Sequence, residues 1–520
     1  MGEALAAMQL TRLLRRAEQI AGPRTAVIFR ERRRTWRDYV GRVARLAGAF
    51  RRLGLAPDGQ VAILMHSSDR YLESLFATLW AGGVVVPLST RGTLDDLARQ
   101  LADSEARMLI VDDDFADHAR RLRPRLASLQ HVIHAGEAVP PDLLDYETLL
   151  AQAEAVTDAG RRNDDTAALF YTGGTTGQSK GVMLTHTNLY SNAINGTALL
   201  RFDDRSIHLH LGPLYHVAAG ARVFTATLVA ATQVVIPRFA PAAVLEAVAT
   251  HGVTVISVVP TMLSMLLRAP ELQTCDLSSL KLITYGAAPM PEVVIDEAVR
   301  RLAHVDFAQA YGMTELSPAC TYLEPHHHRD EKLRRSAGRA APGCEIRIVD
   351  PDDRELPRGK IGEIVVAGPI VMKGYWKQPE LTAQALRGGF MHTGDLGIMD
   401  DDGFVHVVDR LKDMIVTGGE NVYSIEVEDA ILTHPAVAAC AVIGIPDALW
   451  GEAVHAAVVP KEGATLAAED LIAHCRTRIA AFKCPRSIEL RAALPMSGAN
   501  KILKAELRRP FWEGRPRAVN

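Results

Sequence analysis

The chain has 520 residues, of which 48% are hydrophobic and 23% are charged, and its formal net charge at pH 7 is −3. This composition is typical of a folded globular protein, and 520 residues exceed what one hydrophobic core usually organises, so we expect two or more domains. The small net charge gives no electrostatic reason to expect nucleic acid or an anionic membrane as a partner.

The six cysteines show no C-x-x-C spacing, which favours a reduced compartment over a disulfide framework or a zinc site. The N-terminal stretch has neither a sustained apolar run nor a cleavage site, so we expect no signal peptide and a cytoplasmic protein. The apolar stretch 217–236 could be mistaken for a membrane span. Arg222 and Gln233 interrupt it, which favours a buried helix leading into a strand and no stable membrane insertion.

Short apolar strands alternate with helical patterns along the first half of the chain. The predicted elements are helices over 35–53, 71–80 and 93–102 and strands over 61–65, 84–87 and 108–111. The same alternation returns with strands over 253–259, 282–285 and 307–310. It predicts an α/β protein with parallel sheets.

From residue 343 the pattern changes to short strands and turns, which predicts a β-rich subdomain. A charged link, Asp409 to Asp413, follows, and the remaining residues have an α/β pattern of their own. We therefore predict a large N-terminal domain over 1–410 and a small, mobile α+β C-terminal domain over 411–520.

The stretch 169–188 differs from the rest of the chain. An apolar run ends at Tyr171 and is followed by three glycines, three threonines that begin with Thr172, and then Ser179 and Lys180. Glycines allow consecutive backbone N–H groups to converge on an anion, and the hydroxyls and Lys180 add donors. Such a loop suits a polyphosphate, although it is not a Walker A loop, because Lys180 is followed by Gly181 rather than by Ser or Thr.

Other polar clusters follow predicted strands. Gly286-Ala287-Ala288-Pro289 is a small-residue turn that a flat ring could approach, and the cluster Gln309 to Glu315 follows the next strand. Ligands of parallel α/β sheets gather at the carboxyl ends of strands. Asp395 is expected at a turn. The run His326-His327-His328 is expected in a solvated loop, because adjacent histidines cannot all face one ion on a regular element.

In their order along the chain, these groups resemble the signatures of the adenylate-forming enzymes, the superfamily of acyl-CoA synthetases, luciferases and peptide-synthetase adenylation domains. The resemblance covers nearly the whole chain. It implies that ATP and Mg²⁺ activate a carboxylic acid as an acyl-adenylate with release of pyrophosphate, and that the thiol of coenzyme A then displaces AMP.

The resemblance also implies a role for each group. Those implied for the ATP phosphates are Thr172, Gly173, Thr175, Thr176 and Lys180. Those implied for adenosine are Gly286, Ala287, Ala288, Gln309, Tyr311 and Gly312, with Asp395 and Arg410 on the ribose. Thr314 would contact the α-phosphate and Glu315 would bind Mg²⁺.

In such enzymes the C-terminal domain swings between two poses, here about Lys412. The first pose would bring Lys501 between the substrate carboxylate and the α-phosphate. The second would present the face formed by Gly418, Gly419, Glu420 and Asn421 and open a channel for coenzyme A, with His216 as a gate. The family usually has glycine before the lysine, where this chain has Asn500; asparagine tolerates a left-handed backbone, so the loop can still form.

The residues 217–221 would line the acid pocket, and all are small or medium in size. A lysine or arginine there would favour a dicarboxylate, and none precedes Arg222. We therefore expect an apolar acid, either a medium- or long-chain fatty acid or an arylpropenoic acid such as ferulate.

The partners expected are this small acid and coenzyme A, and the sequence leaves a homodimer open. An amino-acid-activating enzyme is the nearest rival function, although no carrier-domain serine motif follows Lys501. A luciferase-like enzyme would share the first half-reaction. A non-catalytic nucleotide-binding relative is a further rival, but such a protein would be expected to lack Lys501 or Glu315.

Overall fold

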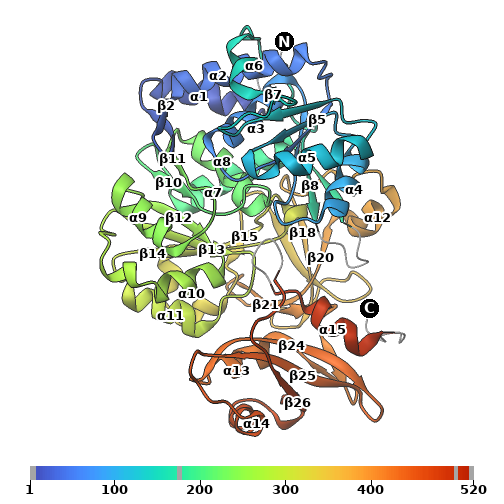
Figure 1. Cartoon of the computed structure of the whole chain (residues 1–520). Coiled ribbons are helices and arrows are strands. Elements are labelled where there is room, and N and C mark those ends of the chain that lie inside the picture. The colour runs from blue at the N-terminus through green and yellow to red at the C-terminus, as the bar shows by residue number, and fades with distance from the viewer. Residues whose placement is uncertain (1–6, 173–178, 497–501, 514–520) are drawn as a thin grey trace.

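The computed structural model describes residues 7–172, 179–496 and 502–513. Within these residues it is a mixed α/β protein with a large N-terminal part and a smaller part beyond β21 (Figure 1). The fold class is as the sequence predicts. None of the described helices combines the length and apolar character that crossing a bilayer requires.

An eight-stranded sheet has the order β19-β9-β8-β4-β3-β5-β6-β7. Its strands are β3 Gln60–Leu64, β4 Val84–Pro87, β5 Met108–Val111, β6 His131–His134, β7 Leu144–Asp145, β8 Thr166–Thr172, β9 Lys180–Thr185 and β19 Gly374–Tyr375. Strands β3 to β8 pair in parallel, but β8 and β9 form an antiparallel hairpin. The predicted phosphate loop therefore joins the two strands of a hairpin rather than following a parallel strand.

A nine-stranded sheet has the order β16-β15-β14-β13-β12-β10-β11-β1-β2. Its strands are β1 Thr25–Phe29, β2 Arg32–Thr35, β10 Ile207–His210, β11 Thr232–Val235, β12 Val255–Val258, β13 Leu282–Gly286, β14 Asp306–Tyr311, β15 Thr321–Leu323 and β16 Arg339–Ala340. Strands β10 to β14 are parallel, so β13 and β14 deliver the ends of two predicted binding segments to one edge of the sheet.

The described α-helices of the N-terminal part are α1 Thr11–Ala21, α2 Trp36–Arg52, α3 Asp69–Ala81, α4 Leu94–Ser104, α5 Ala116–Leu122, α6 Tyr146–Ala151, α7 His186–Leu200, α8 Val217–Leu228, α9 Pro241–His251, α10 Pro260–Arg268, α11 Glu292–Arg301 and α12 Pro379–Ala385. Helix α3 is buried at every residue. Its Phe76 packs edge to face on Phe224 of α8, with ring centroids 5.5 Å apart, so α3 and α8 belong to one interior layer.

An antiparallel four-stranded sheet follows, in the order β17-β18-β20-β21. Its strands are β17 Glu345–Val349, β18 Gly362–Ala367, β20 Met391–Met399 and β21 Val405–Arg410. Beyond β21 lie β22 Ile415–Thr417, β23 Glu420–Val422, α13 Ser424–Leu432, β24 Val437–Asp447, β25 Gly451–Pro460, α14 Ala468–Arg476, β26 Ser487–Leu490 and α15 Lys504–Trp512. Figure 1 shows this last part below the rest of the molecule.

Several predicted elements are confirmed. Helix α2 begins where Thr35 and Asp38 form a reciprocal capping box, which satisfies two backbone N–H groups at the helix start. The stretch 217–236, which resembled a membrane span in its composition, folds into α8 and then β11, as expected of a buried helix leading into a strand.

Candidate active site

Two of the predicted phosphate-binding residues face each other across the β8–β9 hairpin. Thr172 and Lys180 are paired at the loop end of the hairpin, so both would stand at the mouth of the glycine loop. Gly173, Thr175 and Thr176 lie outside the described residues, as does Lys501. Their predicted roles therefore remain predictions.

Glu315 lies beside Lys180 although 135 residues separate them along the chain. It belongs to a single 3₁₀ turn, Thr314–Leu316, and is only 6% exposed. The Tyr375 hydroxyl donates a hydrogen bond of 2.9 Å to its Oε1 atom, and Lys180 Nζ lies 5.3 Å from the centre of the Tyr375 ring. Burial raises the pKa of Glu315, opposed by the Tyr375 hydrogen bond and by Lys180.

Tyr375 was missed by the sequence analysis. Its place depends on the pairing of β19 with β9, which sets Tyr375 opposite Val182. Nothing in the local pattern around residue 375 announces a contact with a hairpin almost 200 residues earlier. The residue is therefore a functional candidate that only the folded sheet reveals.

Asp395 forms a second cluster with Tyr311 and Arg410. The Tyr311 hydroxyl donates to Asp395 Oδ2 over 2.8 Å, and Arg410 Nε lies 3.4 Å from Oδ1. The expectation that Asp395 occupies a turn is wrong. It lies within β20, where antiparallel pairing with β21 places it opposite Arg410, and this pairing brings the two predicted ribose-binding residues together.

The ends of β13 and β14 approach each other closely. A Cβ atom on Gly286 would lie 2.2 Å from the Ala310 carbonyl oxygen, and one on Gly312 would lie 2.3 Å from the Pro318 carbonyl oxygen. Neither position has room for a side chain. Ala287 follows with φ +67°, a left-handed conformation that is unusual for a residue with a Cβ. Ala288 and Gln309, which are half-buried, belong to the same region.

His216 stands at the start of α8, where its ring packs on Tyr215 with ring centroids 4.6 Å apart. Ala218 is exposed and Ala219 is half-buried, although the rest of α8 is mostly buried. The first turn of α8 therefore borders open space, as the predicted acid pocket requires.

The predicted hinge and thiol-channel residues lie around β22 and β23. Lys412 is exposed in the link between β21 and β22, and Gly418 and Gly419 form the two-residue turn of the β22–β23 hairpin, with Glu420 exposed beside them. Both glycines have positive φ, which this kind of turn demands. The turn is remote in sequence from Glu315, so its approach to the phosphate-binding groups stays a prediction.

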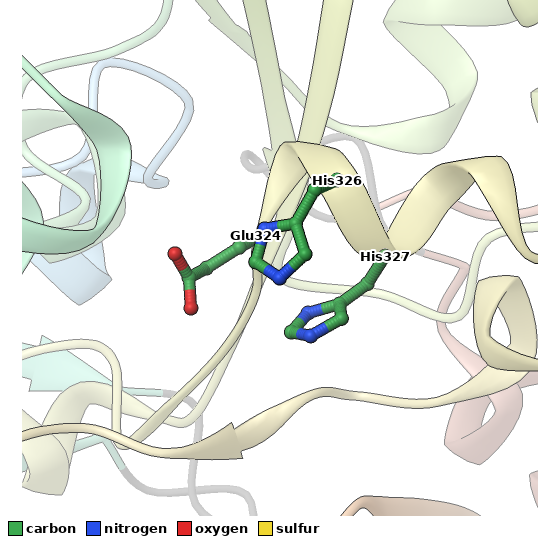
Figure 2. Close-up of side chains that lie close together, drawn as sticks. All are labelled: Glu324, His326 and His327. Atoms are coloured by element: carbon green, nitrogen blue, oxygen red, sulfur yellow. The ribbon is translucent and has the colours of Figure 1, made fainter.

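The histidine run is not a uniformly solvated loop. His328 is 4% exposed, and its ring contacts the Tyr285 hydroxyl at 3.0 Å. Figure 2 shows Glu324, His326 and His327 grouped at one short helical turn, where their ligand atoms lie within 4.8 Å of one another. This turn follows β15, which runs away from Tyr311, so the cluster lies outside the groups described above.

Family models, curated relatives and a solved structure all match this chain over most of its length. The family model described as "AMP-binding enzyme" matches residues 14–376, and "AMP-binding enzyme C-terminal domain" matches residues 426–501. A feruloyl-CoA synthase from Amycolatopsis sp is 42% identical over 92% of this chain and 94% of its own length. An indoleacetate–CoA ligase from Aromatoleum aromaticum is 36% identical over 96% and 98%. The crystal structure of ATP-bound MatB from Rhodopseudomonas palustris superposes with a TM-score of 0.88 at 32% identity, covering 97% of this chain and 100% of that one.

Proposed function

Because the chain belongs to the AMP-binding enzyme family and is an AMP-forming acyl-CoA synthetase, we propose that it joins an apolar carboxylic acid to coenzyme A in two steps. In the first step a carboxylate oxygen attacks the α-phosphorus of ATP and pyrophosphate leaves. In the second step the coenzyme A sulfur attacks the carbonyl carbon and AMP leaves. Fatty acids and arylpropenoic acids are the candidate acids.

The observation that carries this proposal is the cluster of Glu315, Tyr375 and Lys180. A nearly buried carboxylate is a hard oxygen ligand, and Mg²⁺ is commonly held by one or two carboxylates together with substrate phosphates. The Tyr375 hydrogen bond fixes the orientation of the carboxylate, and Lys180, whose Nζ lies over the Tyr375 ring, would neutralise phosphate charge. The donor set therefore fits Mg²⁺ and a triphosphate, and the ion would offset charge on the phosphate oxygens as pyrophosphate departs.

The adenosine part of ATP would lie against the ends of β13 and β14. Asp395, held by Tyr311 and Arg410, can accept hydrogen bonds from two vicinal hydroxyls. The purine would lie beside Gly286 and Gly312, where the neighbouring backbone leaves no room for a side chain. Thr314, next to Glu315, would donate to the α-phosphate, and Lys501 would stabilise the charge that develops there.

The acid would enter beside His216 and lie along the first turn of α8. Ala218 and Ala219 present only methyl groups to this space, which supports an apolar substrate. The relatives named for feruloyl and indoleacetyl substrates support an aryl acid in particular. The C-terminal part would turn about Lys412 between the two steps and bring the 418–421 turn to the site.

The test is pyrophosphate release with a panel of alkyl and aryl acids, measured with and without coenzyme A, with mass detection of the acyl-CoA product. Lys501→Ala should slow acyl-adenylate formation by about two to three orders of magnitude and still convert supplied acyl-adenylate to thioester. The proposal is wrong if no acid supports pyrophosphate release, or if amino acids are the only acids accepted.

A further inference from the structure

Helix α8 carries one arginine, Arg222, in an interior position. Arg222 is 8% exposed, and its Nη1 atom is fully buried with no hydrogen-bond acceptor among the residues that the structure describes. No carboxylate within the described ranges forms an ion pair with it. An arginine side chain is always charged, and a buried charge without a partner is strongly unfavourable. Arg222 therefore lacks the counter-group that its burial demands.

The groups around Arg222 do not supply negative charge. Burial lowers the pKa of His208 well below its ordinary value, with further lowering from His210 and Arg222, so the ring is neutral. Burial raises the pKa of Tyr322, and the nearby Arg222 only partly opposes this, so the hydroxyl keeps its proton. Thr225 follows Arg222 on α8 by about one helical turn, and it is 1% exposed.

These neighbours are also unsatisfied. The Thr225 hydroxyl and His208 Nδ1 are buried, and neither meets a hydrogen-bond partner within the described part of the chain. The Tyr322 hydroxyl is also buried and lies near Arg222, but without good hydrogen-bond geometry. Buried polar groups in native proteins are nearly always hydrogen-bonded. Several orphaned groups close to one unpaired charge indicate a place prepared for a polar ligand group.

The surrounding backbone is shaped to admit the guanidinium. Gly196 of α7 faces Arg222, and a Cβ atom there would lie 3.1 Å from Nη1 and 3.5 Å from the Thr225 hydroxyl oxygen. The Nη1 side of the guanidinium is therefore enclosed between α7 and α8.

Arg222 is aligned with the proposed acid pocket. Residues four apart lie on the same face of a helix. Arg222 therefore lies on the same face of α8 as Ala218, one turn further into the protein, and Ala218 borders the open space at the start of α8. At 1.5 Å per residue, Arg222 is about 9 Å along the helix axis from His216. It is placed to meet the far end of an acid whose carboxylate lies near His216.

We propose that Arg222 forms the floor of the acid pocket and donates hydrogen bonds to an oxygen at the far end of the substrate. This inference rests on the proposed function and changes its substrate class from an apolar acid to an acid with a polar far end. The acid carries an oxygen acceptor opposite its reacting carboxylate, as a ring-hydroxylated aryl acid or an aryl dicarboxylic acid does, and a plain alkyl chain is a poor substrate. Tyr322 and Thr225 add donors to the same oxygen.

The first experiment uses the wild-type enzyme and acids that differ only at the far end. The kcat/KM values are compared for 4-hydroxycinnamate, 4-carboxycinnamate and 4-methylcinnamate, because methyl and hydroxyl groups are similar in size. We expect at least one oxygen-bearing acid to exceed the methyl analogue by about tenfold or more, since a site built for hydrogen bonds rejects analogues that lack them. Preference for the hydroxyl or for the carboxylate identifies which oxygen Arg222 binds. Equal or better use of 4-methylcinnamate, or of a saturated fatty acid, overturns the inference.

The second experiment compares Arg222→Met with Arg268→Met, a matched control on the exposed end of α10. Arg222→Met should reduce the ratio of kcat/KM for the preferred oxygen-bearing acid over 4-methylcinnamate by about tenfold or more, Arg222→Lys should reduce it less, and Arg268→Met should leave it unchanged. An equal loss on every acid would mean that Arg222 is structural, and would overturn the inference.

The two proposals fail in different ways. If none of the acids supports pyrophosphate release, the proposed function is wrong. If acids are converted to thioesters but the far-end oxygen makes no difference, only the role of Arg222 is wrong. The wild-type comparison decides the matter even if Arg222→Met does not fold.

Discussion

Two charged side chains in the N-terminal part, Glu315 and Arg222, are almost equally buried but differ in their surroundings. Glu315 receives a hydrogen bond from Tyr375 and lies near Lys180. Arg222 is enclosed with orphaned hydroxyl and imidazole groups and has no ion-pair partner in the described residues. One charge is oriented before any ligand arrives, whereas the other is left for a ligand to satisfy.

This difference fits the role proposed for each side chain. A group that must hold a metal and phosphates benefits from being fixed in advance, because no reorganisation is needed during the reaction. A group that selects among substrates gains from being unsatisfied, because a substrate without the matching oxygen leaves it unpaired. The first arrangement favours rate and the second favours discrimination.

The largest effect is expected at the fixed charge. Glu315→Gln keeps the shape of the side chain and removes the charge that a hard cation prefers, so ATP use should fall by about two orders of magnitude or more. The measurement is the rate of pyrophosphate release across a Mg²⁺ titration. An unchanged titration curve would exclude Glu315 as the metal-binding residue.

A smaller loss of activity is expected when Glu315 keeps its charge but loses the hydrogen bond that orients it. Tyr375→Phe deletes only the hydroxyl that donates to Glu315, and a hydrogen bond to a charged group contributes about 1.5–3 kcal/mol. We expect a loss of roughly 10- to 100-fold in kcat/KM for ATP. A variant with wild-type kinetics would show that Lys180 and the metal orient Glu315 without help.

Removing the unpaired charge of Arg222 should increase the stability of the protein. Arg222→Met removes a buried charge that has no ion-pair partner in the described residues, so the unliganded protein should gain about 1–3 kcal/mol of stability. Thermal unfolding without substrate, compared with Arg268→Met, measures this gain. A loss of stability would mean that Arg222 is already solvated in the free enzyme.

The smallest effect concerns Gly196, which faces the guanidinium. Glycine within a helix is about 1 kcal/mol less favourable than alanine, but an alanine here would crowd Arg222. Gly196→Ala should therefore be close to neutral in the wild-type background and should stabilise the Arg222→Met protein by up to about 1 kcal/mol. Equal effects in both backgrounds would show that the two residues do not interact.

The histidines add a pH dependence to stability. Burial lowers the pKa of His328 to about 4 from its ordinary 6.5, so the folded protein keeps this ring neutral where the unfolded chain binds a proton. Stability is therefore lost as pH falls from about 6.5 towards 4, by at most about 3 kcal/mol. His328→Gln should flatten the dependence of the unfolding midpoint on pH in this range. An unchanged slope would exclude His328 as its source.

Much of the fold follows from local patterns. The parallel α/β class, α2 with its capping residues, and α8 leading into β11 are set by apolar spacing and nearby hydrogen bonds, which the sequence displays directly. Asp395 was misplaced because a polar residue next to a glycine is typical of a turn, whereas pairing with β21 draws it into a strand. His328 was expected to be exposed because its neighbours are polar, and its burial depends on Tyr285 of another strand.

The candidate site could be predicted only in part. Five of the residues that the family signature names are brought together in two clusters, Glu315 with Lys180 and Asp395 with Tyr311 and Arg410. Tyr375 could not be foreseen because β19 reaches β9 only through long-range sheet pairing, which leaves no local trace. Arg222 was visible only as an interruption of an apolar run, since the absence of a partner is a property of the folded interior.

The short link around Lys412 is fastened by a buried pair of hydrogen bonds. Asp409 is 1% exposed, and its carboxylate accepts hydrogen bonds from the backbone N–H and the hydroxyl of Ser424 at the start of α13. Because these bonds span Lys412, a large rotation there would break them and leave the carboxylate without the Ser424 donors. If the C-terminal part turns about Lys412 as proposed, these hydrogen bonds must break each time, and the frequency of their opening would set an upper limit on how often the two proposed poses alternate. The rate of the whole cycle would then depend on a serine and an aspartate to which no substrate contact is assigned.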